Sequence, residues 1–260
     1  MKNSLYNNDQ RRLYNDLAWL WDIVSPLEDY IEQTELFVDI LKEMSNIPIK
    51  TVLHLGSGRG QNDYIFKKYF DITGVDISST MVDMAKKRNP EVDYRLGDIR
   101  SIRLNTEFDL VTGVDSFDYL TSYDDLKATF ITAYEHLKKG GLFMFILETT
   151  EERFVQNDII AHSNEIGNEQ LTVVENRFDP DLSDDTFELT YVYLYRKDGM
   201  LEIFNDRHLC GLFSEERVVE MLEEIGFEVH LEEFEPPESV FTEPDVYSID
   251  VFPMFICKKL

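Results

Sequence analysis

Between Thr51 and Leu147, short β-rich runs alternate with helix-like segments, and this alternation constrains the fold more than any other feature of the sequence. Between the runs lie residues that typically begin or end helices. Ser78 or Ser79 can act as the N-cap of one helix, and Gly140-Gly141 can end another. Strands that alternate with helices build right-handed βαβ units and a parallel sheet that is covered on both faces. The sequence therefore predicts a doubly wound α/β core with strands over residues 51–55, 72–75, 92–96, 108–114 and 142–147.

The pattern changes after Glu148, where strand-like runs follow one another with turn sequences between them. A polar stretch, Glu151–His162, predicts a helix before these runs, which cover residues 170–178, 186–196 and 200–209. We expect them to form an antiparallel sheet inserted into the α/β core. The core pattern then resumes with a helix from Ser214 and two last strands, residues 227–234 and 254–258.

The chain divides on these patterns into four segments. Residues 1–45 predict two amphipathic helices separated by Ser25-Pro26, and residues 46–150 the α/β core. Residues 151–211 form the insertion, and residues 212–260 complete the core.

Charge and composition argue against several classes of function. The chain has 51 acidic and 25 basic residues, a net charge of −26, whereas nucleic-acid binding needs clustered Lys and Arg. The longest apolar run, Leu142–Leu147, is far shorter than the ~20 residues that span a bilayer, and MKNSLYNNDQRR has no apolar core of a secretory signal. Cys210 and Cys257 are too few for a disulfide framework or a tetrahedral zinc site. We expect a cytoplasmic protein without nucleic-acid, membrane or metal partners.

A glycine-rich loop, Gly56-Ser57-Gly58-Arg59-Gly60, follows the first strand and leads into a helix. Glycines let the backbone approach a ligand closely, and a helix N-terminus favours negative charge. Dinucleotide-binding loops use Gly-x-Gly-x-x-Gly, and here the spacing is one residue shorter. The loop therefore indicates a ligand site but disfavours a nicotinamide cofactor.

Two acidic residues follow the next strands of the predicted sheet. Asp76 comes 20 residues after Gly56 at the tip of the second strand, where a carboxylate can accept both hydroxyls of a ribose. Asp98, in Gly97-Asp98-Ile99 after the third strand, can accept from an adenine amino group. The carboxyl ends of parallel strands share one edge, where open α/β sheets bind ligands. The loop and both carboxylates therefore predict one site at that edge.

Together these motifs resemble those of the class I S-adenosylmethionine (SAM)-dependent methyltransferases. Leu53-His-Leu-Gly-Ser-Gly-Arg-Gly, Asp76, Gly97-Asp-Ile and Phe108-Asp-Leu-Val match that family in order and spacing. The resemblance covers most of the chain and is greatest to small-molecule N-methyltransferases of the glycine N-methyltransferase and nucleotide-amino-sugar dimethyltransferase type. Like them, the chain has Leu212-Phe213-Ser214 at a helix start after the insertion. The resemblance implies a Rossmann-like, mostly parallel seven-stranded sheet with the inserted antiparallel β-sheet as a lid.

The same resemblance implies SAM as the cofactor and assigns its contacts. The glycine loop would contact the methionine part, Asp76 the ribose, and residues after the second to fourth strands the adenine and its surroundings. Aromatic residues of the N-terminal helices would close over the cofactor, although aromatic residues at helical spacing also suit a core. The implied cofactor-binding residues are Gly56, Ser57, Gly58, Asp76, Ile77, Asp98, Ile99, Val114, Tyr30 and Trp21.

The segment after the fourth strand, Asp115-Ser-Phe-Asp-Tyr-Leu, resembles the one that carries substrate-contacting residues in those enzymes. Tyr119 stands where amino-sugar dimethyltransferases have a His. A phenol, with an ordinary pKa near 10, is a poor base at neutral pH but accepts a hydrogen bond from an amine. We expect Tyr119 to orient the acceptor, with packing under the lid as the alternative. Asp115, Asp118 and His208 are the expected substrate-binding residues, unless His208 lies on the outer face of its strand.

Two residues depart from the family pattern. His54 replaces an acid and predicts a hydrogen-bonded structural histidine, while Arg59 replaces a small residue and is expected to face solvent or pair with an acid. We predict a monomeric or homodimeric SAM-dependent methyltransferase that acts on a small molecule, at nitrogen rather than oxygen. An O-methyltransferase, a nicotinamide-dependent oxidoreductase and a non-catalytic SAM-binding module are the alternatives.

Overall fold

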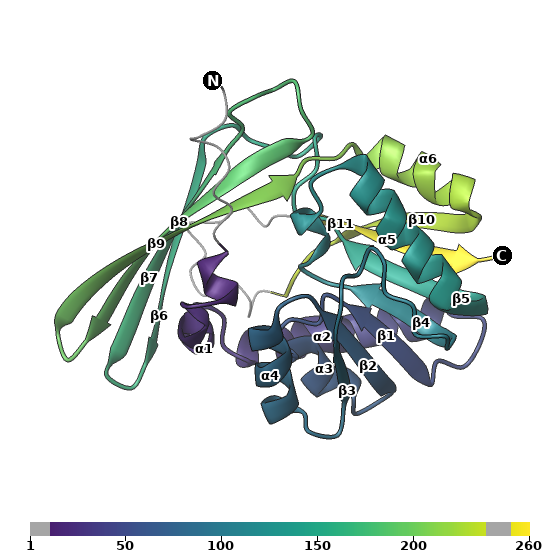
Figure 1. The fold of residues 1–260 in the computed structure, drawn as a ribbon, viewed down its shortest axis with the longest axis horizontal. Coiled ribbons are helices and arrows are strands. Elements are labelled where there is room, and N and C mark those ends of the chain that lie inside the picture. The colour runs from purple at the N-terminus through teal and green to yellow at the C-terminus, as the bar shows by residue number, and fades with distance from the viewer. Residues whose placement is uncertain (1–10, 238–250) are drawn as a thin grey trace.

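The computed structural model describes residues 11–237 and 251–260 (Figure 1). A seven-stranded sheet forms the core, in the order β10-β11-β5-β4-β1-β2-β3. β11 pairs antiparallel with both β5 and β10, whereas β1, β2, β3, β4 and β5 are mutually parallel. The expected mostly parallel sheet is thereby confirmed. Its strands are β1 Thr51–Leu55, β2 Asp71–Asp76, β3 Asp93–Leu96, β4 Phe108–Gly113, β5 Leu137–Ile146, β10 Phe227–Phe234 and β11 Phe252–Lys259.

Helices cover both faces of this sheet because alternate residues of the buried strands point to opposite sides. Leu53 and Leu55 of β1 pack with helices α5, Tyr123–His136, and α6, Glu215–Ile225. Val52 packs on the other face, with α2, α3 and α4. These three helices are Glu28–Met44, Gln61–Phe66 and Ser79–Arg88. The result is the three-layer arrangement that the alternation of strands and helices predicts.

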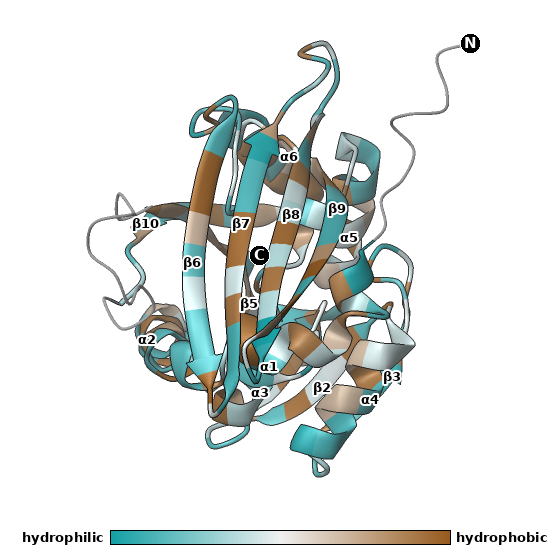
Figure 2. Cartoon of the chain, turned by 90° about the vertical axis from the view of Figure 1, so that its left-hand side faces the viewer, coloured by the Kyte–Doolittle hydropathy of each residue, from teal (hydrophilic) through white to brown (hydrophobic). Residues whose placement is uncertain are grey.

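A second sheet is inserted between β5 and α6 and stands beside the core (Figure 1). Its four antiparallel strands are β6 Asp158–Ile166, β7 Glu169–Phe178, β8 Thr186–Lys197 and β9 Met200–Gly211. Figure 2 shows these strands face on, with polar and apolar residues alternating along them. The insertion is therefore antiparallel, as expected, but it has one strand more than the sequence predicted.

The expected helix at Glu151–His162 is wrong. A turn occupies its beginning, and β6 starts at Asp158. Exposed Ile159 and Ala161 alternate along β6 with the less exposed Ile160 and His162, which is the period of two of a strand and not the period of a helix.

The N-terminal segment, residues 12–24, lies between the inserted sheet and the core (Figure 1). Instead of one amphipathic helix before Ser25, it contains three short pieces: η1 Arg12–Tyr14, η2 Ala18–Leu20 and α1 Trp21–Val24. Its buried apolar side chains pack on the inner face of β7 and β8, in a cluster of Leu13, Leu17, Leu20 and Ile23 with Leu171, Val173, Tyr193 and Tyr195. The inserted sheet therefore holds the segment in place. No helix in the described residues is both long and apolar enough to span a membrane.

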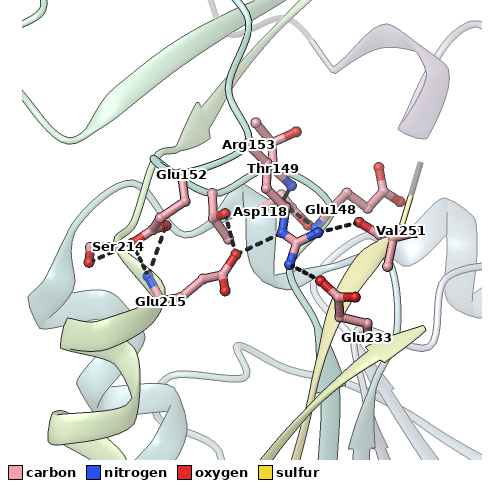
Figure 3. A network of polar contacts seen from close by, with 10 residues as sticks. Asp118, Glu148, Thr149, Glu152, Arg153, Ser214, Glu215, Glu233 and Val251 are labelled. Atoms are coloured by element: carbon pink, nitrogen blue, oxygen red, sulfur yellow. Dashed lines mark hydrogen bonds and ion pairs between the residues drawn. The ribbon is translucent and has the colours of Figure 1, made fainter. Parts of the chain in front are cut away.

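Polar contacts attach the start of the insertion to the core (Figure 3). The Arg153 guanidinium donates from Nε to Glu215 Oε1 at 2.8 Å and from Nη1 to the carbonyl of Val251 at 2.8 Å. Asp118 Oδ1 accepts from the amides of Glu148 and Thr149 at 3.1 and 3.3 Å. Asp118 lies in η3, Phe117–Tyr119, so this bond joins the segment after β4 to the end of β5.

Candidate functional site

A cavity of about 440 Å³ lies at the carboxyl ends of β1, β2, β3 and β4, a volume typical of small-molecule and cofactor sites. The N-terminal segment and α2 contribute the rest of its wall. It brings together residues that are far apart in the sequence. Among those lining it are all ten expected cofactor residues and two expected acceptor residues: Trp21, Tyr30, Gly56, Ser57, Gly58, Asp76, Ile77, Asp98, Ile99, Val114, Asp115 and Tyr119.

The glycine loop bends at three residues with positive φ, namely Gly56 at 74°, Gly58 at 52° and Gly60 at 76°. A Cβ at Gly56 would lie 2.3 Å from Ser116 Cβ, and one at Gly60 would lie 2.5 Å from Tyr94 Oη. Gly58 is different, because a Cβ there would meet no atom within 4 Å although the residue lines the cavity. The first and last glycines therefore allow close packing, whereas Gly58 leaves room on the cavity side.

Asp76 holds the loop and the start of α4 together. Its Oδ2 accepts from the Gly58 amide and its Oδ1 from the Ser78 amide, both at 2.8 Å. The residue is 8% exposed, and burial raises its pKa although both amide bonds favour the carboxylate. Each oxygen retains a lone pair with which it can accept from a further hydroxyl group.

Asp98 is also at the cavity but already has a cationic partner. Arg100 binds it bidentately, from Nε to Oδ1 at 2.9 Å and from Nη2 to Oδ2 at 2.6 Å. The hydrogen bond from Arg100 lowers the pKa of Asp98. The second guanidinium arm of Arg100 reaches Asp125 on α5 at 3.0 Å. Asp98 therefore stays ionised and rigidly oriented.

Arg59 does not face solvent. It is 2% exposed and pairs with Asp22 Oδ1 at 2.5 Å, while its Nη2 donates to the carbonyl of Ser25. Its guanidinium also lies 5.4 Å from the centre of the Trp21 ring. Of the two expected outcomes, pairing with an acid is the one observed, and the pair fastens the N-terminal segment onto the glycine loop.

His54 is the hydrogen-bonded strand histidine that the sequence suggested, since its Nδ1 lies 2.7 Å from Oδ1 of buried Asp63. Its Nε2 is one of several buried polar atoms that have no partner among the described residues. Three others, on Trp21, Ser57 and Arg59, also belong to residues that line the cavity. Unsatisfied buried polar atoms are costly, and their concentration here fits a polar ligand such as SAM.

Asp115 and Asp118 follow β4, and only Asp115 lines the cavity. Asp115 has φ of 58° and lines the cavity, and burial, then the charge of Glu148 and a hydrogen bond to it, raise the pKa of Asp115 well above its usual value. Asp118 does not line the cavity, contrary to its expected place at the substrate, because its carboxylate binds the amides after β5. Burial and the charge of Glu148 raise the pKa of Asp118 to about 7.

Tyr119 connects the cavity to the inserted sheet. Its hydroxyl lies 3.0 Å from Tyr14 Oη and 3.0 Å from His208 Nδ1, and burial raises its pKa well above 10. His208 is 1% exposed and lies on the inner face of β9, behind Tyr119 and not in the cavity wall. The expected direct substrate contact of His208 is therefore not observed. Among the described residues that line the cavity, none comes from the inserted sheet, which reaches it through Tyr119 and the N-terminal segment.

Sequence reasoning missed Tyr14, Asp206 and Glu148. Of these three, only Asp206 could have been predicted from the local sequence. It lies two residues before His208, an expected substrate-binding residue, and residues two apart on a strand share a face. Tyr14 and Glu148 join the site through contacts across the fold. Among the described residues, no group of three His, Cys, Asp or Glu side chains is arranged to hold a metal ion.

Known proteins match the chain in sequence and in structure. A family model described as a methyltransferase domain matches residues 52–141. A dTDP-4-amino-2,3,4,6-tetradeoxy-D-glucose N,N-dimethyltransferase of Saccharopolyspora spinosa is 26% identical over 184 residues, which cover 68% of this chain and 71% of that protein. A dTDP-3-amino-3,4,6-trideoxy-α-D-glucopyranose N,N-dimethyltransferase of Streptomyces venezuelae is 27% identical over 140 residues, 51% of this chain and 58% of that protein.

Two solved structures share the fold across nearly the whole chain. DesVI of Streptomyces venezuelae superposes with a TM-score of 0.79 at 21% identity, covering 94% of this chain and 96% of its own. SAM-bound CalS10, an amino pentose methyltransferase of Micromonospora echinaspora, superposes with a TM-score of 0.77 at 17% identity, covering 89% of this chain and 92% of its own. Residues 52–141 thus form a methyltransferase domain, and with the glycine loop and Asp76 at one cavity the chain is a SAM-dependent methyltransferase.

Proposed function

We propose that this enzyme methylates an amino group of a small molecule, with nucleotide-linked amino sugars as the first candidate class. The observation that carries the proposal is that Asp115 and Tyr119 line the same cavity as the glycine loop and Asp76. A carboxyl group and a phenol oxygen both suit an amine, which is a hydrogen-bond donor and a cation at neutral pH. The amino-sugar substrates named for two relatives support the same class.

Within this proposal the residues divide into a cofactor group and an acceptor group. Asp76 would accept from the ribose hydroxyls, Gly58 would admit the methionine part, and Tyr30 and Trp21 would cover the cofactor from the N-terminal side. Ser57, Gly56, Ile77, Asp98, Ile99 and Val114 would complete the cofactor group. When bound, SAM would supply a sulfonium methyl group for in-line attack by an amine lone pair, with S-adenosylhomocysteine as the leaving group, so orientation of the amine would supply much of the acceleration.

Asp115 and Tyr119 would orient the acceptor nitrogen. Tyr119 remains a neutral phenol because burial raises its pKa, so it acts through a hydrogen bond and not through a charge. The N-terminal segment and residues 151–211 would act as one composite lid, since their apolar side chains pack together. A cytoplasmic location and a monomeric or homodimeric state stay predictions.

The test is turnover of SAM with both dTDP-amino sugars named for the relatives, followed by mass spectrometry of the sugar and detection of S-adenosylhomocysteine. Transfer of one or two methyl groups to nitrogen is expected. The matched control is dTDP-glucose, which offers only hydroxyl groups, and methylation of that sugar would favour the O-methyltransferase alternative. SAM binding in calorimetry without turnover of either amine would refute the proposed acceptor class.

A further inference from the structure

Four side chains form a continuous hydrogen-bonded row from the cavity wall into the inserted sheet. Tyr14 Oη donates to Tyr119 Oη at 3.0 Å, and Tyr119 Oη lies 3.0 Å from His208 Nδ1. His208 Nε2 in turn lies 2.8 Å from Asp206 Oδ2. The two tyrosines line the cavity, whereas His208 and Asp206 are buried behind them at 1% exposure each.

The direction of these hydrogen bonds follows from Asp206. Its Oδ2 also accepts from the Leu13 amide at 2.8 Å, and its Oδ1 accepts from the Arg207 amide at 2.8 Å. Two amides and a ring nitrogen thus converge on Asp206, as they would on a carboxylate. Burial raises the pKa of Asp206, whereas the hydrogen bond and the charge of His208 and the backbone hydrogen bonds lower it. A carboxylate only accepts, so His208 Nε2 must donate to it.

We propose that His208 is a neutral imidazole before the acceptor binds; with its proton on Nε2, it then presents a lone pair at Nδ1. Tyr119 must then donate to Nδ1, and Tyr14 donates to Tyr119. Every hydroxyl proton of the row therefore points toward Asp206, which leaves acceptor lone pairs on the tyrosine oxygens at the cavity end.

We propose that Asp206, His208 and Tyr119 form a proton relay that removes one proton from the ammonium form of the acceptor. This inference rests on the proposed function. The acceptor N–H gives its proton to Tyr119 Oη while the Tyr119 O–H proton passes to His208 Nδ1. On the acceptor an N–H bond breaks, and its electron pair becomes the lone pair of the amine. On Tyr119 one O–H bond forms as the other breaks, and an N–H bond forms at His208 Nδ1, so His208 becomes an imidazolium beside the Asp206 carboxylate. The proton returns to solvent when the product leaves.

In this scheme Tyr119 is the catalytic residue that touches the acceptor. His208 and Asp206 act through it as positioning residues, and His208 also stores the proton. Asp206 is the partner that makes storage possible, because an unpaired buried imidazolium would be costly. Tyr14 orients the Tyr119 hydroxyl, and its ring contacts that of Tyr119 edge-on at 5.4 Å between centroids.

The groups around the relay favour and oppose a charge on His208. The Arg11 guanidinium lies 4.8 Å from the centre of the Tyr119 ring and opposes a second cation, whereas Asp206 favours it. From β8 the Tyr191 ring faces His208 at 5.0 Å, and burial raises the pKa of Tyr191, so it is neutral. The other titratable or charged groups packed around the row are Arg12, Tyr30, Asp76, Asp115, Asp118, Glu175, Tyr193 and Cys210.

The first test is the pH dependence of kcat and KM for Asp206→Asn, with dTDP-3-amino-3,4,6-trideoxy-α-D-glucopyranose as the amine. Asparagine keeps the side-chain volume but cannot balance an imidazolium. We expect kcat at pH 7 to fall ten- to a hundredfold with KM within about threefold of wild type. The deficit should shrink as the pH approaches the pKa of the amine, because the neutral amine then binds directly. A loss of kcat that is equal at every pH would overturn the relay.

The matched control is Glu202→Gln, an acid-to-amide change at an exposed residue of the same strand. It should keep the wild-type pH profile. Equal losses in both variants would mean that any change of charge on β9 has this effect, and the relay would be rejected.

The second test does not depend on turnover or on the folding of a variant. Nitrogen-15 NMR of the histidine rings in the wild-type enzyme should show His208 unprotonated at Nδ1 and protonated at Nε2. The opposite tautomer would refute the relay even in an enzyme that methylates amines. Failure of the wild type to methylate any amine, with the expected tautomer present, would instead count against the proposed function.

Discussion

Replacing Asp76 with alanine should weaken SAM binding at least tenfold, and the structure gives the reason. The carboxylate spans the tip of β2, the Gly58 amide and the Ser78 amide, and it faces the cavity. If the cofactor ribose lies against it, the substitution removes both the acceptor of the ribose hydroxyls and a support of the glycine loop.

The magnitude follows from the number of hydrogen bonds. One hydrogen bond to a charged group contributes about 1.5–3 kcal/mol, so the loss of a single ribose contact already weakens binding about tenfold. The free protein should lose less stability than two amide bonds suggest, because burial raises the pKa of Asp76 and removing the carboxylate relieves that cost. We expect a folded variant that is destabilised by less than about 3 kcal/mol.

Isothermal titration calorimetry with S-adenosylhomocysteine and its 2′-deoxy analogue separates the two effects. In the wild type, the analogue should bind more weakly than the parent compound, whereas in Asp76→Ala the two should bind alike, because the partner of the hydroxyl is gone. Asp71→Ala, at the exposed start of the same strand, is the control and should bind like wild type. An unchanged Kd in Asp76→Ala, or an equal penalty for the analogue in both proteins, would refute the ribose assignment.

Three further substitutions test other parts of the site. Asp118→Asn should stabilise the protein by up to about 4 kcal/mol at pH 8 and have little effect below pH 4. The reason is that the pKa of Asp118 is raised to about 7, so the wild type loses stability as the pH rises from about 3.8 through 7. Melting curves at pH 4, 5 and 8 that show no such trend would contradict this. Arg59→Gln removes the bonds to Asp22 and to the carbonyl of Ser25, so hydrogen exchange of residues 12–25 should become faster, and unchanged exchange would show that apolar packing alone holds the segment. Gly58→Ala should weaken SAM binding more than tenfold and lower the stability by about 1–2 kcal/mol. Gly167 also has a positive φ, and a Cβ there would meet no atom within 4 Å, but the residue does not line the cavity. Gly167→Ala should therefore lower the stability by a similar amount and leave the Kd for SAM unchanged.

The sequence alone determined the α/β core, because that information is local. A strand repeats every two residues and a helix about every 3.6, so the alternation from Thr51 to Leu147 is readable without any tertiary contact. The same is true of the ligand edge, since the tip of each parallel strand is marked by the residue at or directly after its end, as with Asp76 and Gly56. Two elements differ from the sequence prediction. The first N-terminal helix is three short pieces, and β6 replaces a helix because the consecutive apolar residues Ile159, Ile160 and Ala161 show no period of two in the sequence.

Only the tertiary structure decided which side chains meet across elements. Arg59 turns inward because Asp22, 37 residues away, lies above the glycine loop, and Tyr119 meets His208 across 89 residues. Asp118 turns away from the cavity because two amides at the end of β5 offer it hydrogen bonds. Such contacts depend on how the N-terminal segment, the core and the inserted sheet pack together, and local periodicity contains no information about that packing.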